Sequence, residues 1–310
     1  MNHIKPKEVL EKVVDAIPED CRENIVVIGS LAAAYAYFGN NNKMSVRTKD
    51  VDCLLRPFKE ATKKGQMIAR QMLDAGWKQR LLGEFTGPGT ADTPDDKLPA
   101  IRLYPPDINS EVGNPWFIEL LTEPESPKDK GKKWARIIIE EGHFGLPTYR
   151  YLSIATFLPE KIDDLGIYYS RSEMMVLANL LEHPEIKPDI MSTKFEGRKI
   201  KRSNKNLGRV LAVGFLAQQG GLKDFRSWGL EWKEALKYCF PDEWKTLVHD
   251  VRKGLIALLN SDQDMNEAHH TCVYGLLNSY GPTEEDLREV GDRILGEAID
   301  RLEKMADEST

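Results

Sequence analysis

The sequence has few cysteines and no excess of positive charge, and each shortage excludes a class of protein. Its four cysteines stand among 310 residues without a Cys-x-x-Cys pair. This spacing excludes a disulfide framework and a zinc site, so we expect reduced thiols and a cytoplasmic location. The formal net charge of −6 argues against bulk attraction to nucleic acid, although a local basic groove is compatible with it.

Long apolar runs are also missing. No stretch approaches the roughly 20 apolar residues that span a bilayer, so we expect no membrane association. The N-terminal segment is typical of an amphipathic helix rather than of a signal peptide, because Glu8, Glu11 and Asp15 interrupt it.

The pattern of the chain changes near residue 150. Before that point, short apolar segments alternate with helical patterns, which predicts an α/β domain over residues 1–150. Beyond it, helical periodicity dominates, and we expect an all-helical domain over residues 151–310. The predicted fold class is therefore α+β, with a mixed sheet and flanking helices followed by helices alone. Expected strands in the first part are 24–29, 50–55, 100–104 and 116–121, and expected helices are 9–17, 30–38 and 61–76.

Three acidic residues occupy two of the expected strands. Asp50 and Asp52 flank Val51 in "DVDCLL", so both carboxylates point to one face while Val51 enters the core. Like charges this close need compensation, and Mg²⁺ with substrate phosphates is a usual form of it. Glu119 in "WFIELL" is expected to join them across the sheet. Three such carboxylates can hold two metal ions.

The turn Gly29-Ser30 follows the first expected strand and opens a helix. Glycine lets a ligand approach the backbone closely, and the free N–H groups of the first helical turn attract anions. The pair is therefore a candidate phosphate site. Taken alone, Gly-Ser before a helix is more often an N-cap than a nucleotide site, and an aspartate at the start of a strand is commonly a turn residue.

The combined order "VVIGSLAAAYAY…RTKDVDCLL…WFIELLT" resembles the nucleotidyltransferase superfamily with the DNA polymerase β-like core. It is most similar to the AbiEii-like branch of toxin–antitoxin and phage-defence toxins. The resemblance covers residues 9–150 and implies a nucleotidyltransferase-type mixed sheet. It also implies metal ligands and catalysis at Asp50, Asp52 and Glu119, nucleotide binding at Gly29 and Ser30, and further contacts at Arg47 and Thr48, which precede the first aspartate.

A later family motif, Lys-Asp-x-x-Asp, is matched incompletely by "KNLGR". Lys205 agrees and would act as a further catalytic residue, but Asn206 and Arg209 replace the aspartates. The surrounding run 194–209 holds seven lysines and arginines and one glutamate. Such a run is either a solvated face or a wall that faces phosphates.

Two hypotheses follow. In the first, the protein is a Mg²⁺-dependent nucleotidyltransferase that moves an NMP group from an NTP to a hydroxyl on RNA or protein, with a cognate antitoxin as a further partner. In the second, the fold has lost turnover and serves as a nucleotide-sensing or protein-binding module, as Asn206 and Arg209 would favour.

Overall fold

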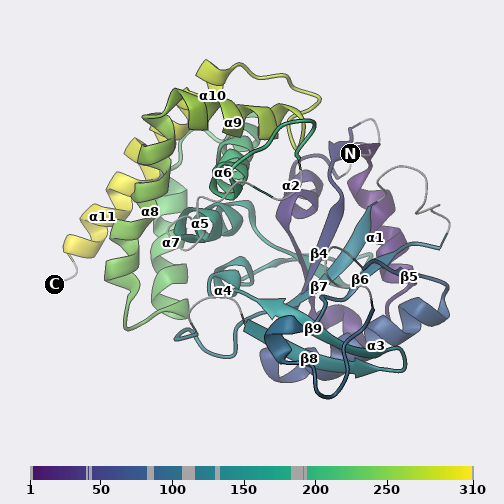
Figure 1. Ribbon diagram of the computed structural model, residues 1–310. Coiled ribbons are helices and arrows are strands. Elements are labelled where there is room, and N and C mark those ends of the chain that lie inside the picture. The colour runs from purple at the N-terminus through teal and green to yellow at the C-terminus, as the bar shows by residue number, and fades with distance from the viewer. Residues whose placement is uncertain are drawn as a thin grey trace.

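The computed structural model combines a mixed sheet with a large group of helices, so the α+β prediction is confirmed (Figure 1). The structure describes residues 3–39, 41, 44–81, 87–106, 116–129, 133–182, 191 and 194–308. Within these ranges, no helix is long and apolar enough to cross a bilayer.

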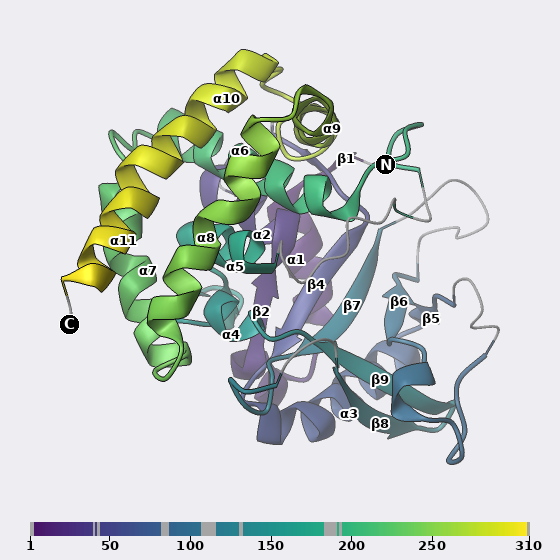
Figure 2. The ribbon, with the colours of Figure 1, turned by 60° about the vertical axis from the view of Figure 1, so that its left-hand side comes forward.

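The central sheet has seven strands in the order β10-β11-β2-β4-β7-β6-β5. β4 runs antiparallel to β2 and parallel to β7, and β6 runs antiparallel to β7. Figure 2 shows β4, β7 and β6 in this order. The strands are β10 (Glu160–Ile162), β11 (Ile167–Tyr169), β2 (Ile25–Ile28), β4 (Asp50–Leu55), β7 (Phe117–Thr122), β6 (Arg102–Tyr104) and β5 (Lys78–Gln79).

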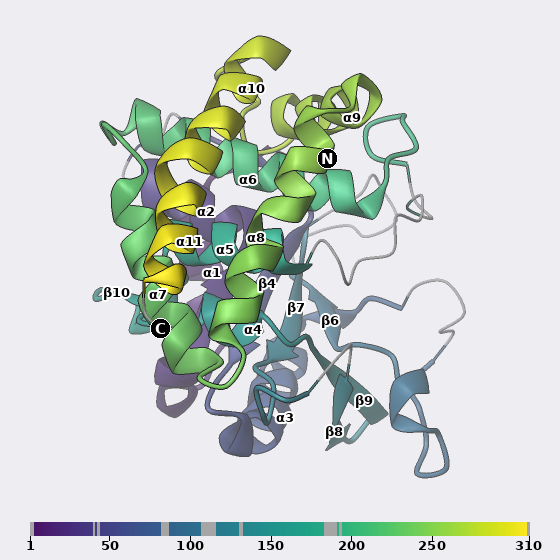
Figure 3. The ribbon, with the colours of Figure 1, turned by 90° about the vertical axis from the view of Figure 1, so that its left-hand side faces the viewer.

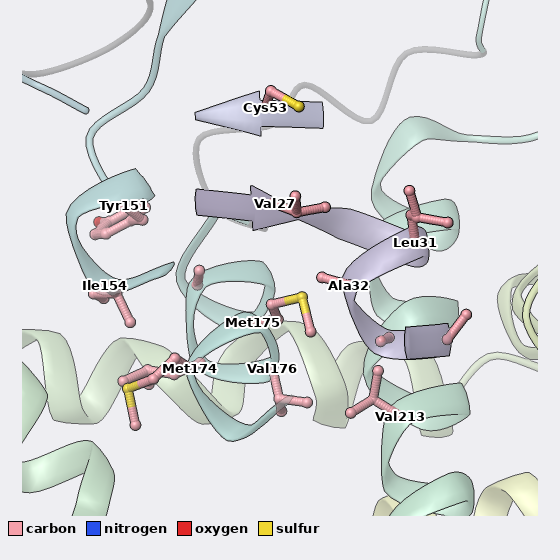
Figure 4. Packing of buried hydrophobic residues seen from close by; sticks show 14 of the residues in the cluster. Val27, Leu31, Ala32, Cys53, Tyr151, Ile154, Met174, Met175, Val176 and Val213 are labelled. Atoms are coloured by element: carbon pink, nitrogen blue, oxygen red, sulfur yellow. The ribbon is translucent and has the colours of Figure 1, made fainter. Parts of the chain in front are cut away.

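Three helices from the first part pack on the apolar face of this sheet, in one core with Val51, Cys53 and Leu55 of β4. They are α1 (Pro6–Asp15), α2 (Gly29–Phe38) and α3 (Phe58–Asp74). α2 lies between the sheet and the C-terminal helices. Figure 4 shows its Leu31 and Ala32 beside Val27 of β2 and Met175 of α5. The small alanines on α2 let these layers approach closely, because they add little volume between the two backbones.

The helical part forms the other side of the molecule, at the left in Figure 1 and in front in Figure 3. Its apolar residues join the same core, so both parts share one interior. A capping box of Thr283 and Asp286 starts α10. The helices are α5 (Ser172–Glu182), α6 (Arg202–Gln219), α7 (Arg226–Cys239), α8 (Trp244–Leu259), α9 (Asp262–Val273), α10 (Glu284–Arg293) and α11 (Asp300–Asp307), with a π-helical turn at Ile294–Ile299.

The expectation of an all-helical region after residue 150 is wrong. After the short helix α4 (Leu152–Ala155), β10 and β11 add two strands to the sheet, and β11 pairs in parallel with β2. Strands of three residues are too short to show an alternation of apolar and polar side chains in the sequence. The sequence also gave no sign of the hairpin of β8 (Lys133–Ile139) and β9 (Gly142–Thr148), which packs against α3 and β7. A further pair, β1 (His3–Ile4) and β3 (Val46–Arg47), lies outside the main sheet.

Candidate active site

The acidic residues lie on the face of the sheet opposite to α1, α2 and α3. The strand register places Ile28, Asp52, Glu119 and Arg102 side by side across β2, β4, β7 and β6. Paired residues on neighbouring strands point to the same face and lie about 5 Å apart. Two residues earlier on β4, and on the same face, Asp50 pairs with Phe117 of β7. The sheet therefore brings all three acidic side chains to one face.

Gly29 lies directly beside this row. Its φ of +74° is in the left-handed region, and a Cβ atom built on it would lie 2.6 Å from Asp52 Oδ2. Both facts favour glycine, because a larger residue would be strained and its Cβ would push against the carboxylate. α2 begins at Gly29 without a side-chain cap, so the N–H groups of its first turn, at Ser30 and beyond, have no capping side chain.

Asp50 is held by its neighbours. The buried Thr48 hydroxyl donates a hydrogen bond of 2.9 Å to Asp50 Oδ1. Burial would raise the pKa of Asp50, but attraction by Lys205 and Arg209 and the Thr48 hydrogen bond lower the pKa below its ordinary value. The carboxylate is therefore ionised and oriented.

Asp52 has the opposite character. Burial, followed by repulsion from Asp50 and Glu119, raises the pKa of Asp52 to about 8. Among the described residues, none donates a hydrogen bond to its carboxylate or forms an ion pair with it. A half-buried carboxylate without a partner is unfavourable, and a bound cation would remove the penalty.

Glu119 is held by an arginine of β6. Its carboxylate forms a bidentate ion pair with Arg102, at 2.8 Å for Nε to Oε2 and 3.1 Å for Nη2 to Oε1. In the part of the chain that the structure describes, no three carboxylate, imidazole or thiol side chains group closely enough to hold a metal ion. Asp50 and Asp52 fit Mg²⁺ as a pair, because this ion takes one or two carboxylates together with substrate phosphates. Glu119 would have to leave Arg102 to add a third.

Two cations of α6 face the aspartates. Lys205 and Arg209, one turn apart, both attract Asp50 and Asp52. Neither forms an ion pair with a described residue. Asn206 points elsewhere and donates a hydrogen bond of 3.0 Å to Glu182 of α5. Arg209, which breaks the family motif, thus supplies a second positive charge to the site.

The contacts of Arg47 within the described ranges do not include the aspartates. It belongs to β3, its backbone N–H donates to the Gly275 carbonyl at 3.4 Å, and its Nε is buried without a hydrogen-bond partner. No interaction among the described residues links its guanidinium to Asp50 or Asp52. Thr48 is therefore the residue of the Arg-Thr pair that contacts an aspartate.

Sequence reasoning missed two cations near Asp50. Arg80 follows β5, and its guanidinium lies over the Phe117 ring with Cζ 3.8 Å from the centroid. Lys49 precedes Asp50, and its carbonyl accepts a hydrogen bond of 2.8 Å from Phe117 N–H. Lys49 lies inside "RTKDVDCLL" without a role assigned by the motif, and Arg80 stands in no motif. The pairing of β4 with β7, and of β7 with β6 and β5, brings the two together.

Comparison of the chain with protein-family models, with curated proteins and with solved structures gave no significant match.

Proposed function

We propose that this protein is a Mg²⁺-dependent nucleotidyltransferase with a nucleotidyltransferase-type core. One observation supports the proposal most strongly: Asp50 and Asp52 share a strand face directly beside the positive-φ Gly29 turn that opens α2. A carboxylate pair and an uncapped helix start at the same place offer ligands to a metal ion and to the phosphates that accompany it.

In this proposal the NTP lies with its triphosphate against Gly29 and Ser30, and Lys205 and Arg209 neutralise its charge. Asp50 and Asp52 would hold Mg²⁺, which would supply stabilisation of the negative charge that develops on the phosphates. An acceptor hydroxyl bonds to the α-phosphorus as the bond to the β-phosphate breaks. Pyrophosphate leaves, and the hydroxyl proton passes to water. The protein contributes mainly positioning and charge neutralisation.

The alternative function is nucleotide binding without transfer. It is favoured by the Arg102–Glu119 ion pair, which occupies the third carboxylate, and by the absence of aspartates at 206 and 209. On this reading, the protein would serve as a nucleotide sensor or a protein-binding module. A toxin role with a cognate antitoxin is a further proposal, and it rests on the motif resemblance alone.

Labelled nucleotides separate the two functions. We expect label from an α-³²P NTP to appear on an acceptor in a mixture of RNA and protein, in the presence of Mg²⁺. Asp50→Ala should abolish this labelling. Asp250→Ala should leave it unchanged, because Asp250 is a half-buried residue of α8 that pairs with Lys253. Equal labelling by wild type and Asp50→Ala would refute the transferase. Binding of Mg·NTP without labelling of any acceptor would favour the sensor.

A further inference from the structure

A second group of basic side chains lies on the opposite side of Asp50 from the Gly29 turn. In the sheet, β2 is on one side of β4, whereas β7, β6 and β5 are on the other. Phe117 of β7 is the direct neighbour of Asp50, and the Arg80 guanidinium lies over its ring. The positive charge of Arg80 therefore lies over the strand that neighbours Asp50, on the side away from Gly29.

Lys49 adds a second charge at the same place. Its backbone is hydrogen-bonded to Phe117, and its ammonium group is attracted by Glu196 and repelled by Arg80. Within the described ranges, neither cation forms an ion pair with a carboxylate, whereas Arg102, which is also half-buried, does. The Nε atom of Arg80 is buried without a hydrogen-bond partner.

This arrangement suits a phosphate group. Lys49 and Arg80 repel each other. Asp50 attracts both cations and Glu196 attracts Lys49, but among the residues that the structure describes neither carboxylate forms an ion pair with these cations, so a bound dianion would relieve the repulsion. The ring of Phe117 fixes the plane of the Arg80 guanidinium, and such a fixed fork matches two phosphate oxygens. Lys49 would add a point charge from the start of β4.

We propose that Arg80 and Lys49 form a second phosphate-binding site, which holds a phosphate group of the acceptor molecule. This inference rests on the proposed function. In an in-line displacement, the attacking hydroxyl and the leaving pyrophosphate lie on opposite sides of the α-phosphorus. With pyrophosphate at Gly29, the acceptor lies on the Phe117 side, where these cations are. The acceptor class is thus a hydroxyl compound that bears a phosphate near the reacting hydroxyl, rather than an unphosphorylated protein side chain.

The same chemistry could come from the NTP itself, and a binding experiment separates the two sources. Inorganic phosphate is titrated calorimetrically into the full-length protein, alone and with saturating Mg²⁺ and a non-hydrolysable ATP analogue. Arg80→Gln removes the charge and keeps a polar side chain that can donate hydrogen bonds. Arg252→Gln is the matched control, because Arg252 is also half-buried but lies on α8, paired with Asp300 and Glu303. Thermal unfolding of both variants checks that they fold.

We expect phosphate to bind wild type even with the analogue bound, and Arg80→Gln to weaken this binding about tenfold or more, as loss of charge-assisted hydrogen bonds implies. Arg252→Gln should bind phosphate as wild type does, and Arg80→Gln should bind the analogue normally. Equal phosphate affinity in Arg80→Gln, or competition between phosphate and analogue, would overturn the inference. Failure of wild type to bind the analogue would instead refute the proposed function, and the titration without analogue would still report phosphate binding by Arg80.

Discussion

Asp52 allows a test of the site that needs no substrate. Burial and the charges of Asp50 and Glu119 raise the pKa of Asp52 to about 8, against about 3.9 in an unfolded chain. Between these values the folded protein keeps a proton that the unfolded chain has released. The free energy of unfolding therefore falls as the pH rises through this window, by up to about 1.4 kcal/mol per pH unit.

The assay compares urea unfolding of wild type and Asp52→Asn at pH 5, 6, 7 and 8 without divalent metal. Asparagine cannot ionise, so the difference between the two proteins isolates Asp52 from carboxyl groups such as Glu123 and Glu173, whose pKa values burial also raises. From pH 5 to pH 8, we expect wild type to lose stability relative to Asp52→Asn, on the order of a few kcal/mol.

Magnesium provides the second half of the test. If Mg²⁺ binds the ionised pair, it should stabilise wild type more at pH 8 than at pH 5, and should stabilise Asp52→Asn little at either pH. Parallel pH curves for the two metal-free proteins would show that Asp52 titrates normally, and would refute the crowded carboxylate pair on which the proposal depends.

Three further outcomes follow from the geometry. Gly29→Ala should lower the free energy of unfolding by about 1–2 kcal/mol through backbone strain alone, as thermal unfolding can check. It should also weaken Mg·NTP binding in calorimetry, because the new Cβ displaces Asp52. Lys205→Ala should weaken Mg·NTP binding about tenfold with little change in melting temperature; unchanged binding would remove this residue from the site. Arg102→Gln should release Glu119 and increase the affinity or number of Mn²⁺ ions bound in electron paramagnetic resonance titrations, whereas an unchanged titration would show that the ion pair does not compete with metal.

Much of the α/β part could be predicted from local patterns. The alternation in "DVDCLL" gave both the strand and the common face of Asp50 and Asp52, because side chains alternate along any strand. The alanine-rich segment after Gly29-Ser30 predicted a helix over 30–38, and α2 begins one residue earlier, at Gly29. The resemblance to nucleotidyltransferases stays a prediction, since the comparisons neither support nor oppose it.

The rest depended on pairing between distant segments. The Arg102–Glu119 ion pair and the stacking of Arg80 on Phe117 exist because β6 and β5 extend the sheet beyond β7. No local pattern specifies that order. The strand β11 returns to pair with β2 from residue 167, across a sequence separation of about 140 residues, and register of this kind is set by the whole fold.

The most direct test of the account is a calorimetric titration of the protein with a non-hydrolysable NTP, with and without Mg²⁺. We expect wild type to bind only when Mg²⁺ is present, Asp50→Asn and Asp52→Asn to lose that binding, and Asp250→Asn to keep it. Binding that is equally tight in EDTA, or that survives both substitutions in β4, would contradict a metal–triphosphate site at these aspartates.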